Sequence, residues 1–242
     1  MNLIIDAGNT TIKVSFFESG QLVYSKYILG LHQEFKNLFE EYPKISSVLI
    51  CDVRGLDWDF LRNIFDPKNI YTPSSSWIFP FESKYKTPNT LGIDRIGLIA
   101  GASKIYPFKD VLVIDVGSCI TYDLLNKENI YLGGIISPGY NMRYKSLKEF
   151  TGKLPLVENV TIKKSLGDDT KTSIQTGVFH GIYHEISGQI DYFRYKYDNL
   201  IIVLTGGDCH QLSKRLKNPI FVHPNFLVKG LNDILELNKT QI

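Results

Sequence analysis

The most constraining feature of this sequence is a motif that occurs twice. One copy runs from Leu3 to Lys13 and the other from Val111 to Asp123. Each contains an apolar segment, an aspartate, a turn with glycine and hydroxyl residues, and a second apolar segment. Such a turn offers backbone N–H groups and hydroxyls to an anion, while its aspartate can hold a cation or its water. The repeat predicts two similar halves that grip the phosphates of a nucleotide across a cleft, as in an ATP-using phosphotransferase.

Composition indicates an ordinary globular protein. The 242 residues are 43% hydrophobic and 21% charged, and the net charge of +2 is too small to indicate a nucleic-acid partner. No apolar run reaches the ~18 residues of a membrane helix, and the N-terminal residues have the pattern of a strand and not of a signal peptide. Cys51, Cys119 and Cys209 lie far apart without a C-x-x-C pattern, as is usual for free thiols in the cytosol. We expect a cytoplasmic protein that binds neither membranes nor nucleic acid.

Periodicity predicts the same plan in both halves. The expected strands are 2–6, 12–17, 21–28 and 47–52 in the first half, and 111–114, 130–137, 200–204 and 220–222 in the second. The expected helices are 31–42, 57–65, 93–106, 140–150, 172–197, 209–216 and 226–237. A strand meander followed by alternating helices and strands indicates a sheet covered by helices on both faces. We therefore expect an α/β protein with two halves, 1–107 and 108–242.

The first turn is the sharper of the two phosphate motifs. Gly8 permits a tight backbone and close approach of a phosphate, the residues after it donate hydrogen bonds, and Lys13 adds a positive charge. An ordinary hairpin turn would also explain Asp-x-Gly-Asn, but the second copy of the motif disfavours that alternative. The predicted ATP-binding residues of this turn are Asp6, Ala7, Gly8, Asn9, Thr10, Thr11, Ile12 and Lys13.

The second turn adds a cation argument. It begins at Asp115 and carries Ser118 and Thr121, and Asp123 alternates with Thr121 along the same strand. Asp115 could simply cap the end of a strand. Phosphates close to a carboxylate, however, require a cation between them, which favours a functional role for Asp115.

Two further segments carry candidate chemistry. Gly206 and Gly207 follow a predicted strand and precede a helix, a junction that suits close backbone approach to an adenine nucleoside. Asp94 lies at the start of a predicted helix, whose positive end favours the ionised carboxylate that could deprotonate a substrate hydroxyl. Arg95 could hold a substrate carboxylate through its planar donors. Taken alone, a capping aspartate and a surface arginine would explain this pair equally well.

Read in order, these segments resemble the motifs of type III pantothenate kinases. The resemblance covers nearly the whole chain, and each motif is weak while the ordered series is strong. The matching segments are Asp6 to Thr10, Tyr85 with Leu91 to Arg95, Asp115 to Ser118, Gly133 to Gly139, Thr176-Gly177 and Thr205 to Asp208.

The resemblance implies a fold, a reaction and a set of residue roles. The fold is that of the acetate and sugar kinase, Hsp70 and actin superfamily, a duplicated actin-like (ribonuclease H-like) fold around a nucleotide cleft. The reaction is phosphorylation of pantothenate by ATP to 4'-phosphopantothenate, the first step of coenzyme A synthesis, with Asp94 as the base. The implied pantothenate-binding residues are Tyr85, Gly92, Ile93, Asp94, Arg95 and, from the neighbouring subunit of a homodimer, Thr176.

The same resemblance implies the ion requirements. Asp115 binds a monovalent cation, K⁺ or NH₄⁺, while Ser118 contacts the nucleotide phosphates, and Mg²⁺ accompanies ATP, held by Asp6 directly or through water. One departure concerns the second motif, where the family usually has Thr-Ala and this chain has Ser118-Cys119. Serine keeps the hydroxyl, so the bulkier Cys119 affects local packing more than chemistry.

The long predicted helix provides a second reason to expect a homodimer. Its apolar residues exceed what one stripe against a core requires, which predicts a second apolar contact. These residues are Val178, Ile182, Ile186, Ile190 and Phe193.

Two alternative functions belong to other classes. A sugar kinase or polyphosphate phosphatase of the same superfamily would share the phosphate turns, but the segment from Leu91 to Arg95 offers few groups for sugar hydroxyls. A nucleotide-binding regulator without catalysis would not require the base Asp94 alongside Asp6 and Asp115.

Overall fold

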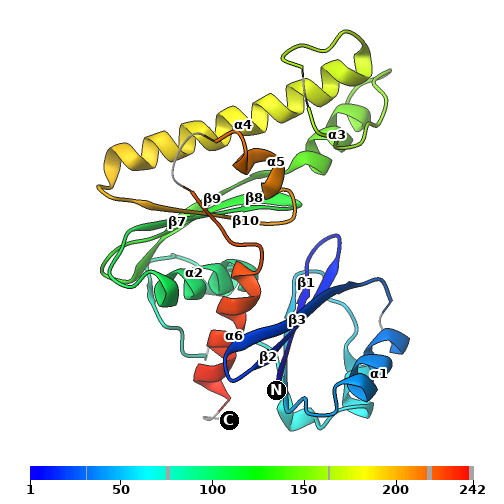
Figure 1. Ribbon diagram of the computed structural model, residues 1–242, viewed down its shortest axis with the longest axis vertical. Helices are drawn as coiled ribbons and strands as arrows, with labels where there is room; N and C mark the ends of the chain where they lie inside the picture. Colours follow the sequence, from blue (N-terminus) through cyan, green and yellow to red (C-terminus); the bar gives the residue numbers. More distant parts are fainter. Residues whose placement is uncertain (31, 75–76, 163, 217–219, 240–242) are drawn as a thin grey trace. The chain divides into compact units, whose positions relative to one another are not determined.

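The computed structural model describes residues 1–30, 32–74, 77–162, 164–216 and 220–239 (Figure 1). Its chain divides into two compact units. Unit 1 contains 1–107, 129–131 and 225–242, and unit 2 contains 108–128 and 132–224. The C-terminal residues thus group with the N-terminal ones, a long-range association that no local pattern could indicate. The division into two domains at 1–107 and 108–242 stays a prediction.

Unit 1 is built on a five-stranded sheet in the order β3-β2-β1-β4-β5. The strands are β1 (Asn2–Ala7), β2 (Ile12–Glu18), β3 (Gln21–Ile28), β4 (Ser47–Asp52) and β5 (Ile70–Tyr71). β1 pairs antiparallel with β2 and parallel with β4. Because β1 and β4 carry near-continuous apolar runs, they can be buried on both faces at the centre of the sheet. The helices are α1 (His32–Glu41), α2 (Ile93–Ile105) and α6 (Phe226–Asn238), with 3₁₀ turns at Asp59–Asn63, Pro67–Asn69 and Pro88–Thr90.

Helices α2 and α6 pack against each other at glycines. A Cβ atom on Gly230 would overlap the backbone oxygen of Gly97, so only glycine allows this approach. Two polar contacts tie α6 to the rest of unit 1. Lys104 forms an ion pair with Asp233, with Nζ 2.5 Å from Oδ1. The buried Asn2 side chain donates a hydrogen bond of 2.8 Å to an α6 amide oxygen, that of Asn232. These contacts explain why the C-terminal helix belongs to this unit.

Unit 2 repeats the sheet plan in the order β11-β10-β7-β8-β9. The strands are β7 (Val111–Val116), β8 (Cys119–Leu125), β9 (Ile130–Pro138), β10 (Ile201–Thr205) and β11 (Phe221–Val222), and the helices are α3 (Tyr140–Glu149), α4 (Thr170–Lys196) and α5 (Cys209–Ser213). The long helix α4 lies along one face of this sheet (Figure 1). The first two residues of β9, Ile130 and Tyr131, belong to unit 1 and not to unit 2. There they pair with the short strand β6 (Glu82–Ser83) of the same unit.

The two sheets confirm the predicted duplication. In each, a central strand pairs antiparallel with the strand that follows it and parallel with a later one. Asp6 of β1 lies opposite Lys13 and Cys51, while Asp115 of β7 lies opposite Thr121 and Thr205. The two aspartates therefore occupy equivalent register positions at the ends of equivalent strands.

Three sequence predictions need correction. The segment 57–65 forms a 3₁₀ turn at 59–63 and not a full helix, and 209–216 is helical only over 209–213. The apolar residues of α4 form one stripe and not two, because they recur every fourth position and face the core of unit 2. Val178, Ile182, Ile186 and Ile190 are buried in this core and Phe193 packs against it. They therefore give no support to a second apolar contact.

Candidate active site

The first phosphate turn joins β1 to β2 with its polar side chains on the surface. Asn9, Thr10 and Thr11 are exposed, as a turn that binds a ligand requires. Ala7 and Ile12 pair across the start of the hairpin and are buried, so only their backbone could reach a phosphate. Gly8 lies between the buried Ala7 and the exposed Asn9. A side chain at this position would hinder the approach of a ligand to the backbone.

Asp6 is a half-buried carboxylate at the start of this turn. Its pKa is raised to about 6, first because burial penalises the charged form, and second because the charge of Asp94 repels it. Lys13, the register partner of Asp6, has the opposite effect and lowers that pKa. Burial in turn lowers the pKa of Lys13 itself. Asp6 and Asp94, which are 88 positions apart in sequence, thus lie close enough for their charges to interact.

Lys13 is oriented by residues that the sequence analysis missed. Its Nζ donates a hydrogen bond of 2.6 Å to Oδ1 of Asn225 and lies 5.6 Å from the centre of the Tyr27 ring. Asn225 directly precedes α6, at the other end of the chain. No local pattern could have assigned it to the first turn.

Asp94 lies in the first turn of α2, where Gly92 leaves room for its carboxylate. A Cβ on Gly92 would overlap Oδ1 of Asp94, and the same oxygen accepts a hydrogen bond of 2.8 Å from the backbone N–H of Arg95. Asp94 and Ile93 are half-buried. The glycine and the helix start therefore hold the carboxylate in a defined place.

Arg95 is buried, with only 5% of the residue exposed, so the surface-arginine alternative is wrong. Its Nη2 donates a hydrogen bond of 2.6 Å to the Tyr131 hydroxyl, and its guanidinium carbon lies 5.5 Å from the centre of the Tyr85 ring. The Tyr85 ring stacks on the Tyr131 ring, with centres 6.0 Å apart. The structure thus brings the predicted pair Tyr85 and Arg95 together and adds Tyr131, which the sequence analysis did not select.

In unit 2, the second phosphate turn is closely flanked by two glycine segments. The backbone N–H of Gly139 donates to the Ser118 carbonyl at 3.1 Å, and that of Asp208 donates to the Val116 carbonyl at 3.0 Å. Gly206 has a φ of +95°, and a Cβ there would overlap an oxygen of Asp115. The segments around Asp115, Gly139 and Gly206, which are far apart in sequence, therefore meet at one turn. Ser118 is half-buried and Gly207 is exposed at this turn.

Cys119 and Thr176 complete the predicted set in unit 2. Cys119 is accommodated beside Met142, with the two sulfur atoms 3.7 Å apart, which accounts for the bulkier residue after Ser118. Thr176 lies on α4 with only 7% of the residue exposed, and its reach to a second subunit stays a prediction. Over the described residues, no three His, Cys, Asp or Glu side chains gather to hold a metal ion. A cation at Asp6 or Asp115 would therefore also need phosphate, water or backbone oxygens.

A sequence model of the family described as type III pantothenate kinase matches residues 2–192 of this chain. The chain belongs to this family. A relative from Christiangramia forsetii named type III pantothenate kinase is 44% identical over the full length of both chains. None of the helices within the described ranges is long and apolar enough to span a membrane.

Solved structures place the type III pantothenate kinase chain among actin-like sugar kinase folds. A Campylobacter jejuni protein of the Baf family has a TM-score of 0.62 and 24% identity, with 98% of this chain and 99% of that chain covered. A 2-dehydro-3-deoxygalactonokinase structure from Sinorhizobium meliloti has a TM-score of 0.59 at 8% identity, with 98% of each chain covered. The predicted fold class, a duplicated actin-like α/β fold, is confirmed.

The raised pKa of Asp6 predicts how this kinase chain responds to pH. The folded state holds a proton on Asp6 more tightly than the unfolded state does, so stability falls as pH rises from about 4 to about 6. Asp6→Asn removes the penalty and should raise the free energy of unfolding at pH 8 by about 1–3 kcal/mol, with no gain near pH 4. Urea unfolding at both pH values measures this, with the exposed Asp191→Asn as control. A gain that is equal at both pH values would contradict the assignment.

Proposed function

We propose that this chain phosphorylates pantothenate with ATP to give 4'-phosphopantothenate, the first step of coenzyme A biosynthesis. The observation that carries the proposal is the grouping of Asp94, Asp6 and the buried Arg95 in unit 1, in a chain of the type III pantothenate kinase family. Asp6 belongs to a phosphate turn and Asp94 to a substrate segment, so their proximity puts a base next to a phosphate site. ATP and pantothenate are the substrates.

In the proposed reaction, Asp94 accepts the proton of the primary hydroxyl of pantothenate. The hydroxyl oxygen then forms a bond to the γ-phosphorus of ATP while the bond from that phosphorus to the bridging oxygen breaks, and ADP leaves. Arg95 holds the carboxylate of pantothenate together with Tyr85, Gly92 and Ile93. Phosphoryl transfer depends mainly on positioning and on charge stabilisation, which suits a site built from rigid turns.

The ATP-binding residues are the first turn and three residues of unit 2. The first turn supplies backbone N–H groups, exposed hydroxyls and Lys13, and unit 2 supplies Ser118, Gly206 and Gly207. Mg²⁺ bound with ATP would neutralise phosphate charge, and Asp6 would hold it directly or through water. We also propose a cytoplasmic location, in line with the three free cysteines, and cell fractionation would test it.

The base assignment predicts a large and specific effect of Asp94→Asn. The amide keeps the size of the side chain but cannot take the hydroxyl proton, so kcat should fall about 10²- to 10⁴-fold. Steady-state kinetics with pantothenate measures kcat. Thermal unfolding measures the melting temperature, which should change little because the fold is kept.

The exposed Asp191→Asn is the matched control, and hexoses are the rival substrates. A kcat near the wild-type value in Asp94→Asn would remove Asp94 from the mechanism. Wild-type turnover with a hexose and not with pantothenate would favour the sugar kinase, and absence of any turnover would favour a regulator.

A monovalent cation at Asp115 is the second requirement we propose. Without it, the carboxylate would repel the phosphates of ATP, so activity should be lost when K⁺ and NH₄⁺ are replaced by a bulky cation at equal ionic strength. Restoring K⁺ should restore activity in the wild type and much less in Asp115→Asn. Full activity in buffer free of K⁺ and NH₄⁺ would refute the role of Asp115.

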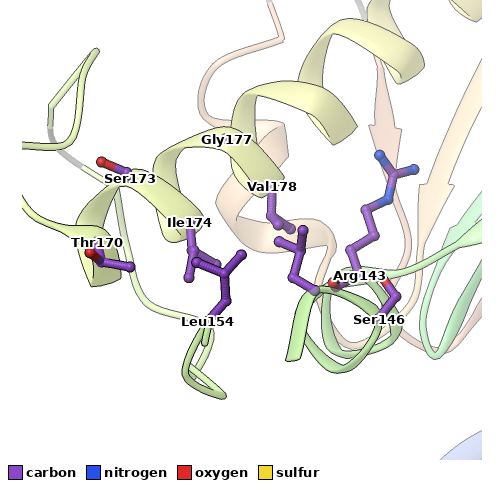
Figure 2. A pocket seen from close by; sticks show the side chains of 9 residues that line it. Arg143, Ser146, Leu154, Thr170, Ser173, Ile174, Gly177 and Val178 are labelled. Atoms are coloured by element: carbon purple, nitrogen blue, oxygen red, sulfur yellow. Dashed lines mark hydrogen bonds between the residues drawn. The ribbon is translucent and has the colours of Figure 1, made fainter. Parts of the chain in front are cut away.

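We also propose a homodimer with shared active sites, supported by a groove between α3 and α4. This groove has a volume of about 730 Å³ and is lined mainly by apolar surface next to the helix that carries Thr176 (Figure 2). Its lining residues are Arg143, Ser146, Leu147, Leu154, Thr170, Ser173, Ile174, Gly177 and Val178. Phe150, just after α3, is 84% exposed, and Leu166, just before α4, is 80% exposed. Exposed apolar side chains near the ends of the two helices that line a groove are typical of an interface between subunits.

The dimer proposal predicts that Phe150→Asp and Leu166→Asp produce monomers. Both side chains are exposed in the single chain, so folding should be preserved while a charge enters the interface. Light scattering measures the mass, and pantothenate kinase activity should fall with dimer content if Thr176 acts in the neighbouring site. Tyr195→Asp, at an equally exposed position near the other end of α4, is the control. A monomeric and fully active wild type would contradict the shared site.

A further inference from the structure

Tyr131 contacts both Arg95 and Tyr85, the basic and the aromatic side chain that the proposed function assigns to the binding of pantothenate. Its hydroxyl accepts the 2.6 Å hydrogen bond from Nη2 of Arg95, and its ring stacks on that of Tyr85 at an angle of 18°. The residue is fully buried, and Phe81 packs edge-on against its ring. One side chain therefore determines where both Arg95 and Tyr85 lie.

The backbone around Tyr131 fixes the same arrangement. Ser83 of β6 is its register partner, and the backbone N–H of Lys84 donates to the Tyr131 carbonyl at 3.0 Å. These bonds hold the segment before Tyr85 against the start of β9. The Tyr85 backbone N–H in turn donates to the Ser83 hydroxyl at 3.1 Å, which closes the turn that leads the Tyr85 ring onto Tyr131.

The chemistry of this hydrogen bond suits a substrate carboxylate. A phenol is a neutral acceptor, so it orients the guanidinium without cancelling its positive charge, whereas a carboxylate in the same place would neutralise it. The flat packing of Tyr85 and Tyr131 near the guanidinium further limits its rotation. An arginine held in this way keeps its charge and its planar donors in one orientation.

We propose that Tyr131 is a positioning residue that orients Arg95 toward the carboxylate of pantothenate. The proposal rests on the proposed function and extends it to a residue on β9. Tyr131 itself need not touch the substrate. Its contribution should therefore show in the binding of the carboxylate substrate and not in the binding of ATP or in the chemical step.

Tyr131→Phe tests this, because it removes one oxygen and keeps the ring that packs on Tyr85. Hydrogen bonds to charged groups are strong enough that the KM for pantothenate should rise about tenfold or more, with kcat and the KM for ATP each within about threefold. Tyr122→Phe is the matched control. Its hydroxyl is also on a buried strand tyrosine and donates at 2.8 Å to Glu185, in unit 2. It should leave the KM for pantothenate within about twofold.

A second comparison guards against a purely structural effect. In an Arg95→Gln background, Tyr131→Phe should cause no further rise in the KM for pantothenate, since the oriented group is already gone. An unchanged KM in Tyr131→Phe, a parallel rise in both KM values, or the same rise in the Arg95→Gln background would overturn the positioning role. Wild-type protein that does not phosphorylate pantothenate would instead overturn the proposed function itself.

Discussion

A half-buried carboxylate at the end of the central strand is the constraint on which unit 1 depends. Asp6 has a pKa raised to about 6 because folding removes it from water and brings Asp94 near it. Lys13, opposite Asp6, lowers the pKa of Asp6, and Gly92 leaves room for the carboxylate of Asp94. A carboxyl group with a raised pKa is common where charges take part in catalysis or in the binding of ions.

Unit 2 uses the same strand end with a different local solution. Asp115 occupies the register position of Asp6, but its partner across the hairpin is Thr121 where Asp6 has Lys13, and the backbone N–H groups of Gly139 and Asp208 bond to its turn. Gly139 and Gly206 allow this approach, because a Cβ at either position would overlap the turn. Close backbone on both sides leaves few side-chain ligands, which is consistent with a cation that completes its shell from phosphate, water and carbonyl oxygens. The two units thus share the central strand and its aspartate, while the surroundings of the two aspartates differ.

The sequence was a good guide wherever local pattern decides structure. The alternating and continuous apolar runs predicted the strands around Asp6 and Asp115, and the repeat predicted that both halves share one sheet plan. The predictions for short segments were wrong, because tertiary context decides whether 57–65 becomes a helix or a 3₁₀ turn. The roles of Tyr131 and Asn225 could not be predicted, since each depends on a contact between residues far apart in the chain.

The basic side chains of unit 1 show how a site can bind anions and remain ordered. Lys13 donates to the amide oxygen of Asn225 and lies over the Tyr27 ring, while Arg95 donates to the Tyr131 phenol and lies over the Tyr85 ring. In both cases a neutral oxygen and an aromatic face restrict the cation. Neither contact consumes the charge, so the ordering entropy is paid during folding and the attraction is kept for phosphate or carboxylate. A pair of preordered cations near two acids is therefore a reasonable basis for binding two anionic substrates in one orientation.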